Sequence, residues 1–219
     1  MAQFAMRLFT DRLAAGSELA LEGGARRVLY VAEGGVGVTA GESVAALGAN
    51  SAWYGGPAVL RAGAAGGRVL RYELGDGTAA GQGVETSLTL QANVSLDPAA
   101  AYLIRCDRVE FPPGGVAYTH THQGPGIRCL QLGRIRIDTG GASHHCQPGE
   151  AWFESGPDPV FAAGSETEAT AFVRVMLLPR EYLGRSSIRY VKPEDQDKPK
   201  RQSYQIHIDA PLTLPGRPA

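Results

Sequence analysis

Two histidines separated by a single residue, His120 and His122, are the side chains of this chain whose spacing most suggests chemistry. In an extended strand, residues two apart point to the same face, so Tyr118, His120 and His122 would share one face. Two imidazoles directed at one point suit a transition metal. Two ligands do not complete a metal site, and the alternative is a pair of half-exposed histidines at a sheet edge.

The composition favours an all-β fold that could position such a pair. The 219 residues include 29 glycines and 14 prolines, and only 20% of them are charged, which is typical of many short strands joined by turns. A net charge of −1 without a basic stripe argues against binding to nucleic acid or to an acidic membrane surface. No apolar stretch approaches the roughly 20 residues that cross a bilayer.

The cysteines and the first residues of the chain indicate in which cellular compartment the protein is expected. Cys106, Cys129 and Cys146 are irregularly spaced and form no CxxC pair, so we expect reduced thiols. Charged residues interrupt the apolar residues of the first sixteen positions, which therefore lack the apolar core of a signal peptide. The expectation is a soluble, cytoplasmic protein.

An internal repeat predicts the architecture. Six residues recur at one constant separation along the chain: Gly34, Val36, Val38, Gly41, Trp53 and Tyr54 correspond to Gly133, Ile135, Ile137, Gly140, Trp152 and Phe153. Beyond Pro57 and Pro157 the register slips, and we align residues 68–72 with residues 172–176. The chain therefore reads as two copies of one all-β unit.

The repeat divides the chain into four segments. We expect an N-terminal barrel at 1–85, a strand-forming linker at 86–101, a C-terminal barrel at 102–183 and an extended tail with edge strands at 184–219. In the C-terminal copy the predicted strands are 102–111, 117–122, 127–132, 135–138, 151–154, 160–162 and 171–178.

The stretch around the histidines resembles the first motif of the cupin superfamily. That motif is a glycine, five residues, His-x-His, three or four residues, a glutamate, six residues and a glycine; the spacing from Gly114 to Gly133 matches it, with Gly126 in the place of the glutamate. Residues 149–161 resemble the second motif in outline, with Val160 in the place of its histidine. In the alignment of the two copies, the residues of the N-terminal copy that correspond to His120 and His122 are Leu21 and Gly23.

The resemblance implies a bicupin, which is two double-stranded β-helix barrels in tandem, each with a ligand site in its mouth. It also implies a divalent transition metal, Fe, Mn, Ni or Zn, held by His120 and His122. The preferred hypothesis is a metal-dependent enzyme of dioxygenase, isomerase or lyase type that acts on a small organic substrate. The alternative is a non-catalytic bicupin that binds a small ligand or a partner.

Other residues could complete such a site. Glu154 would add a carboxylate to the two imidazoles, a donor set associated with non-haem Fe(II) chemistry. Tyr118 could carry a proton as a general acid or base. Arg128, if it enters the barrel, could anchor a substrate carboxylate, whereas the competing interpretation leaves it in solvent.

Two further residues are candidates for substrate binding, and the tail is a candidate for subunit contacts. Trp152 and Val160 are candidate substrate-binding residues, although the recurrence of Trp152 as Trp53 also favours a core role. The strand-forming tail could complete a neighbouring subunit, which would make the protein a homodimer.

Overall fold

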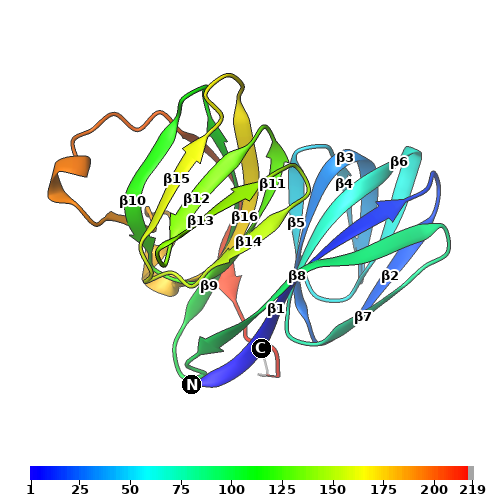
Figure 1. Ribbon diagram of the computed structural model, residues 1–219. Helices are drawn as coiled ribbons and strands as arrows, with labels where there is room; N and C mark the ends of the chain where they lie inside the picture. The colour runs from blue at the N-terminus through cyan, green and yellow to red at the C-terminus, as the bar shows by residue number, and fades with distance from the viewer. Residues whose placement is uncertain (217–219) are drawn as a thin grey trace. The chain divides into compact units, whose positions relative to one another are not determined.

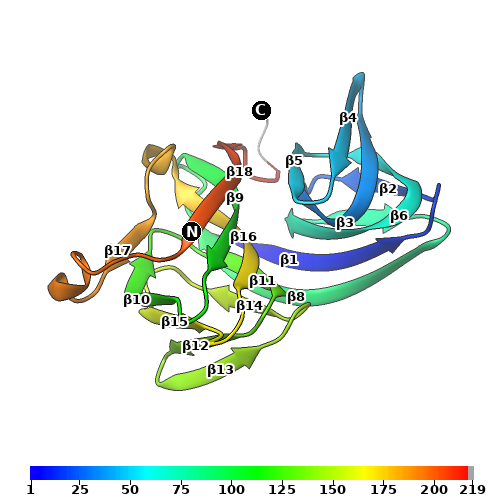
Figure 2. The same cartoon turned by 90° about the horizontal axis from the view of Figure 1, so that it is seen from above.

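The computed structural model describes residues 1–216 and divides into two compact units (Figures 1 and 2). One comprises Met1–Ala100 together with the residues from Thr213 onward, and the other comprises Ala101–Leu212. Both are built from antiparallel strands, and the described residues contain only two short 3-10 helices. The all-β prediction is therefore confirmed. Among residues 1–216, no helix has the length and apolar character needed to cross a membrane.

The N-terminal unit is one eight-stranded sheet in the order β4-β3-β6-β1-β8, with β2 paired to β6 and β7 and with β5 paired to β3. Its strands are β1 (Ala2–Leu13), β2 (Glu18–Gly23), β3 (Arg26–Ala40), β4 (Ser43–Gly48), β5 (Ser51–Gly55), β6 (Ala58–Leu74), β7 (Gly77–Ala80) and β8 (Val84–Leu96). Register shifts interrupt the β3–β6 ladder, and such irregularities let long strands bend.

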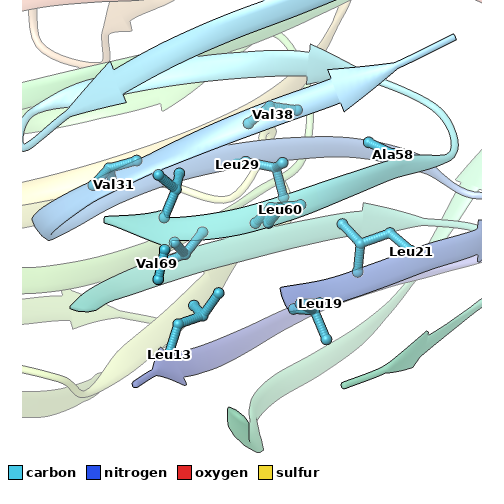
Figure 3. Packing of buried hydrophobic residues seen from close by; sticks show 11 residues of the cluster. Leu13, Leu19, Leu21, Leu29, Val31, Val38, Ala58, Leu60 and Val69 are labelled. Carbon is cyan, nitrogen blue, oxygen red and sulfur yellow. The ribbon is translucent and has the colours of Figure 1, made fainter. Parts of the chain in front are cut away.

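Apolar side chains fill the interior of this unit. Leu29, Leu60 and Val69 are completely buried, and Figure 3 shows them packed with Leu13 and Leu19 from the neighbouring strands. Burial of side chains of this size contributes about 1.5–3 kcal/mol each relative to exposure. Leu60 and Val69 are an odd number of residues apart in β6, and the interrupted β3–β6 ladder lets both enter the same cluster despite the alternation of side chains.

Four buried charged residues, which we call the N-terminal charge cluster, lie in the same unit: Asp11, Arg27, Arg71 and Glu73. Glu73 Oε1 accepts hydrogen bonds from Arg27 Nε and from Arg71 Nη1, both at 2.7 Å. Arg71 also donates to both carboxylate oxygens of Asp11, at 2.7 and 3.1 Å. The two cations and two anions compensate one another, as buried charges require.

The C-terminal unit consists of two five-stranded sheets, in the orders β13-β12-β15-β10-β17 and β14-β11-β16-β9-β18. Figure 1 shows β10, β15, β12 and β13 in one layer. The strands are β9 (Tyr102–Phe111), β10 (Val116–His122), β11 (Gly126–Leu132), β12 (Ile135–Thr139), β13 (Ala142–Cys146), β14 (Ala151–Glu154), β15 (Val160–Gly164), β16 (Thr170–Pro179), β17 (Ile188–Tyr190) and β18 (Ser203–Leu212). Residues from both sheets, among them Phe111, Ile137, Trp152 and Phe172, form its core.

The tail adds one strand to an edge of each sheet of this unit. After the 3-10 helix η1 (Arg180–Tyr182), β17 pairs with β10, and β18 pairs with β9 (Figure 2). The connection between them contains the 3-10 helix η2 (Pro193–Asp195). In this chain the tail therefore pairs with strands of its own unit and runs from one sheet to the other.

The pairing of strands corrects one detail of the repeat. Leu29 pairs with Trp53 and Arg71, and the corresponding Arg128 pairs with Trp152 and Arg174. Arg71 therefore matches Arg174, whereas the sequence alignment set it one residue away, against Val175. Short β-branched runs look alike in either register, yet a shift of one residue exchanges the two faces of a strand.

Candidate functional site

His120 and His122 lie side by side in the interior of the C-terminal unit, each with 5% of its surface exposed. Their Nε2 atoms are 3.2 Å apart, and the rings meet edge to face. His120 Nδ1 is 2.7 Å from the Tyr118 carbonyl oxygen. Because a carbonyl can only accept a hydrogen bond, Nδ1 of His120 carries the proton and its Nε2 presents a lone pair.

The second imidazole is held by the tail. His122 Nδ1 is 3.3 Å from Ser187 Oγ, and Ser187 is buried immediately before β17. The ladder between β10 and β17 sets His122 opposite Ile188 and His120 opposite Tyr190. The tail thus pairs with the backbone of both histidines through β17 and contacts the His122 ring through Ser187.

Burial disfavours the protonated form of both imidazoles. Burial lowers the pKa of His120, and the hydrogen bond to Tyr118 and the charge of Glu154 offset only part of this effect. Burial holds the pKa of His122 well below its ordinary value, and the cationic Arg128 and Arg174 lower it further. Neutral imidazoles are the form that ligates metals.

Glu154, at the end of β14, points toward the histidine pair. Its Oε2 lies 3.4 Å from His122 Nε2 and 2.7 Å from Arg128 Nη2, while its Oε1 accepts a hydrogen bond of 2.8 Å from Trp152 Nε1. The carboxylate is therefore adjacent to the pair, as the third donor must be, and is at the same time ion-paired with an arginine.

Arg128 enters the interior and does not lie in solvent, because only 1% of its surface is exposed. Nη1 donates a 2.6 Å hydrogen bond to the Gly126 carbonyl, and a Cβ atom built on Gly126 would lie 3.1 Å from that Nη1. The guanidinium thus lies beside position 126, where the cupin motif has its glutamate, together with the Val175 carbonyl oxygen and the Met176 side chain, which are nearer to that Cβ atom. A cation replaces the anion of the motif at this point.

A second buried ion pair lies nearby. Arg174 of β16 donates from Nε and Nη2 to the two carboxylate oxygens of Asp107 in β9, at 2.6 and 2.9 Å. Burial lowers the pKa of Arg174, but the adjacent Asp107 carboxylate more than offsets this, so that the pKa is raised overall. This pair borders a cavity of about 410 Å³ whose other walls come from β17, β18 and the tail.

Sequence reasoning did not identify Asp107, Arg174 or Ser187 as site residues. A signal was available for Arg174, because it is the single charge in the otherwise apolar run of β16, and such a charge is buried with a partner. The partner and the cavity follow from cross-strand register and from the path of the tail. Neither can be read from one stretch of sequence.

The prediction that Tyr118 and His120 lie on the same face of the strand is wrong. The register of β10 shifts between Ala117 and His120, and Ala117 is buried in the core as the two histidines are, so the alternation is interrupted. The Tyr118 ring is only half-buried and lies 4.8 Å from Lys198 Nζ of the tail.

Val160 and Trp152 lie in the hydrophobic core of the C-terminal unit. Val160 pairs with His120 across the ladder between β15 and β10, and Trp152 packs against Phe172 with ring centroids 5.2 Å apart. Trp152 also orients Glu154 through its indole N–H. Within residues 1–216, no group of three or more His, Cys, Asp or Glu side chains has the arrangement of a metal site.

Comparisons with known proteins give a likeness of fold. No family model matches the sequence, and no curated protein matches it. A deletion mutant of oxalate decarboxylase from Bacillus subtilis matches with a TM-score of 0.63 at 12% identity, over 88% of this chain and 73% of that chain. AerE from Microcystis aeruginosa matches with a TM-score of 0.61 at 10% identity, over 78% of this chain and 87% of that chain.

A further structure of the same decarboxylase, studied for its Mn(II) centres, has a TM-score of 0.61 at 11% identity, over 84% of this chain and 71% of that chain. At such identities the likeness concerns the fold alone. The chain has the antiparallel, cupin-like β architecture that the motif resemblance implied.

Proposed function

We propose that the C-terminal unit is a cupin-type metal centre in which His120 and His122, with Glu154, hold a divalent transition metal, Fe, Mn, Ni or Zn. The observation that carries the proposal is the 3.2 Å separation of the two Nε2 atoms. A single ion about 2.0–2.1 Å from each nitrogen fits such a separation. Burial lowers the pKa of both rings, and Tyr118 and Ser187 contact their Nδ1 atoms, which leaves Nε2 for the metal.

The activity that we propose is that of a metal-dependent enzyme of dioxygenase, isomerase or lyase type acting on a small organic molecule. A divalent ion at this position would supply Lewis acidity toward a substrate oxygen. The protein's own contribution is orientation: the Tyr118 carbonyl and Ser187 fix the imidazoles, and the indole N–H of Trp152 fixes the Glu154 carboxylate. The tail strand β17 pairs with β10 beside the two histidines, which are both buried.

A second candidate function is a metal-free protein that binds a small ligand. The observation that favours it is the position of Arg128, whose guanidinium lies beside position 126 and pairs with Glu154 at 2.7 Å. This arrangement neutralises the carboxylate without a metal and places positive charge near the two histidines. Positive charge at that distance disfavours a divalent cation and favours an anionic ligand.

We also propose that the chain consists of two barrels. Equivalent pairing of β3 with β5 and β6, and of β11 with β14 and β16, supports a bicupin with a histidine-free first copy. We further propose a homodimer as the assembly, which sedimentation of the full-length protein would test.

Metal analysis separates the two candidate functions. Protein purified without chelator would be compared with His120→Ala, His122→Ala and His144→Ala variants, the last altering an exposed histidine of β13. Metal retained by the parent protein and by His144→Ala, but lost from the other two, would support the metal centre. Negligible metal in all four proteins would overturn it and leave the metal-free ligand-binding function.

A further inference from the structure

The cavity of about 410 Å³ beside the histidine pair carries uncompensated positive charge. Two of the four cationic side chains that line it are neutralised: Arg174 by Asp107, and Arg105 by Asp209 at 2.9 Å. The other two belong to the tail, and they determine the charge that the cavity presents to a ligand.

Arg185 and Lys200 are these two cations. Within residues 1–216 the Arg185 guanidinium makes no ion pair. Lys200 Nζ donates to the backbone carbonyls of Asp195 and Gln196, which leave its charge in place. The Asp195 carboxylate itself pairs with Lys198 at 2.6 Å. Two positive charges at the rim of one cavity select an anion.

The backbone of Arg185 is fixed although its guanidinium is not. Arg105 of β9 donates to the carbonyl oxygens of Arg185 and Tyr182, at 2.8 and 2.7 Å, and the Gly184 N–H donates to Asp209 of β18 at 2.8 Å. The turn after η1 is thereby tied to two strands. An anchored backbone lowers the ordering cost when the guanidinium engages a ligand.

Apolar side chains also line the cavity. Ile188 and Tyr190 come from β17, and Tyr204 and Ile206 come from β18. Tyr204 and Ile206 remain 43% and 53% exposed, so their side chains are accessible to a ligand. Cavities of 300–1,000 Å³ with apolar walls and a few polar anchors are typical of small-molecule sites.

The cavity adjoins the histidine pair. Ser187 lines it and contacts His122 Nδ1 at 3.3 Å, and Tyr190 lines it with its ring centroid 6.4 Å from that of His120. We propose that this cavity binds an organic carboxylate with an apolar body, in which Arg185 receives the carboxylate and Tyr190 and Tyr204 contact the body. That this molecule is the substrate rests on the proposed function, whereas its binding does not.

Calorimetric titration of the full-length protein with three probes tests the inference. Benzoate has the proposed charge and body, benzamide has the body without the charge, and oxalate has the charge without the body. We expect benzoate to bind at least about tenfold more tightly than either of the others, since a hydrogen-bonded charge contributes about 1.5–3 kcal/mol. Equal binding of benzoate and benzamide, or tighter binding of oxalate, would overturn the inference.

Variants locate the site. Arg185→Gln should weaken benzoate binding about tenfold, and Lys200→Gln should weaken it to a smaller extent. Arg189→Gln serves as the control, because Arg189 is exposed in the same tail and is not among the described residues that line the cavity. Unchanged affinity in Arg185→Gln, with circular dichroism as in the parent, would refute the assignment. Repeating the titration in chelator separates it from the metal proposal, because binding should persist there.

Discussion

Replacing Asp107 by asparagine should destabilise the C-terminal unit strongly, although the change removes only a charge. Asp107 and Arg174 are bound through two hydrogen bonds, and their side chains are 3% and 6% exposed. Asparagine keeps the shape and one acceptor, but it leaves the guanidinium buried without a counter-charge. The remaining compensation comes from the face of the Tyr204 ring, whose centroid is 5.4 Å from the guanidinium carbon, and from the charge of Glu154.

The size of the effect follows from the burial of the pair. Removing one partner of a buried ion pair lowers the free energy of unfolding by about 3–5 kcal/mol. Because asparagine retains one acceptor, we expect a loss of about 3 kcal/mol. That loss raises the unfolding equilibrium constant by roughly two orders of magnitude. With a urea dependence of about 2 kcal/mol/M, the midpoint of unfolding should fall by about 1.5 M.

Tryptophan fluorescence can follow this unit by itself. The sequence has two tryptophans, Trp53 in the N-terminal unit and Trp152 in the core of the C-terminal unit. In a Trp53→Phe background, urea titration reports the surroundings of Trp152. Following one unit at a time is necessary because a chain of two units need not unfold in a single step.

A matched control lies on the same strand. Glu110 pairs with Arg108 at 2.7 Å on the outer side of β9, and its side chain is 55% exposed. Exposed pairs contribute about 0–1 kcal/mol, so Glu110→Gln should barely move the midpoint. Equal midpoints for Asp107→Asn and Glu110→Gln would refute the argument that burial makes the Asp107–Arg174 pair indispensable.

Two further predictions concern the N-terminal charge cluster and the histidine pair. Glu73→Gln should lower the stability of the N-terminal unit by about 3–5 kcal/mol, because two buried guanidinium groups share one Glu73 oxygen; Glu33→Gln, which alters a 66% exposed side chain, is its control, and equal urea midpoints would contradict the prediction. Ser187→Ala should weaken metal binding about tenfold by releasing the His122 ring, as measured by competition with a fluorescent chelator. Ser143→Ala, which alters an exposed serine of β13, is the control for that change, and equal affinities would show that Ser187 does not orient the ring.

Local sequence patterns were sufficient for the fold class and for the histidine pair. Strand alternation depends only on neighbouring residues, so His120 and His122 could be placed on one face from their spacing. The repeated Trp53 and Trp152 led to the prediction of two similar units; Trp152 lies in the core of the C-terminal unit, and Trp53 packs, partly buried, against that of the N-terminal unit. Glu154 was only a candidate third ligand, for which an exposed position at a strand end was the favoured interpretation, and the structure places its carboxylate beside His122 and Arg128.

The tertiary structure alone decided the neighbours of that pair. Arg128 lies beside Gly126 and pairs with Glu154, and this depends on which strands are adjacent to β11. The shifted register in β10 moved Tyr118 off the expected face, because a bulge is set by pairing across strands and not by the sequence of one strand.

The sequence by itself determined an all-β chain and a closely spaced histidine pair, since these features follow from periodicity within single strands. Only the tertiary structure brought Arg174, Asp107 and the tail around that pair, since they are far apart in sequence and meet through sheet pairing. The charge and shape of the resulting cavity are therefore properties of the assembled strands, while the imidazoles beside it are visible in the sequence.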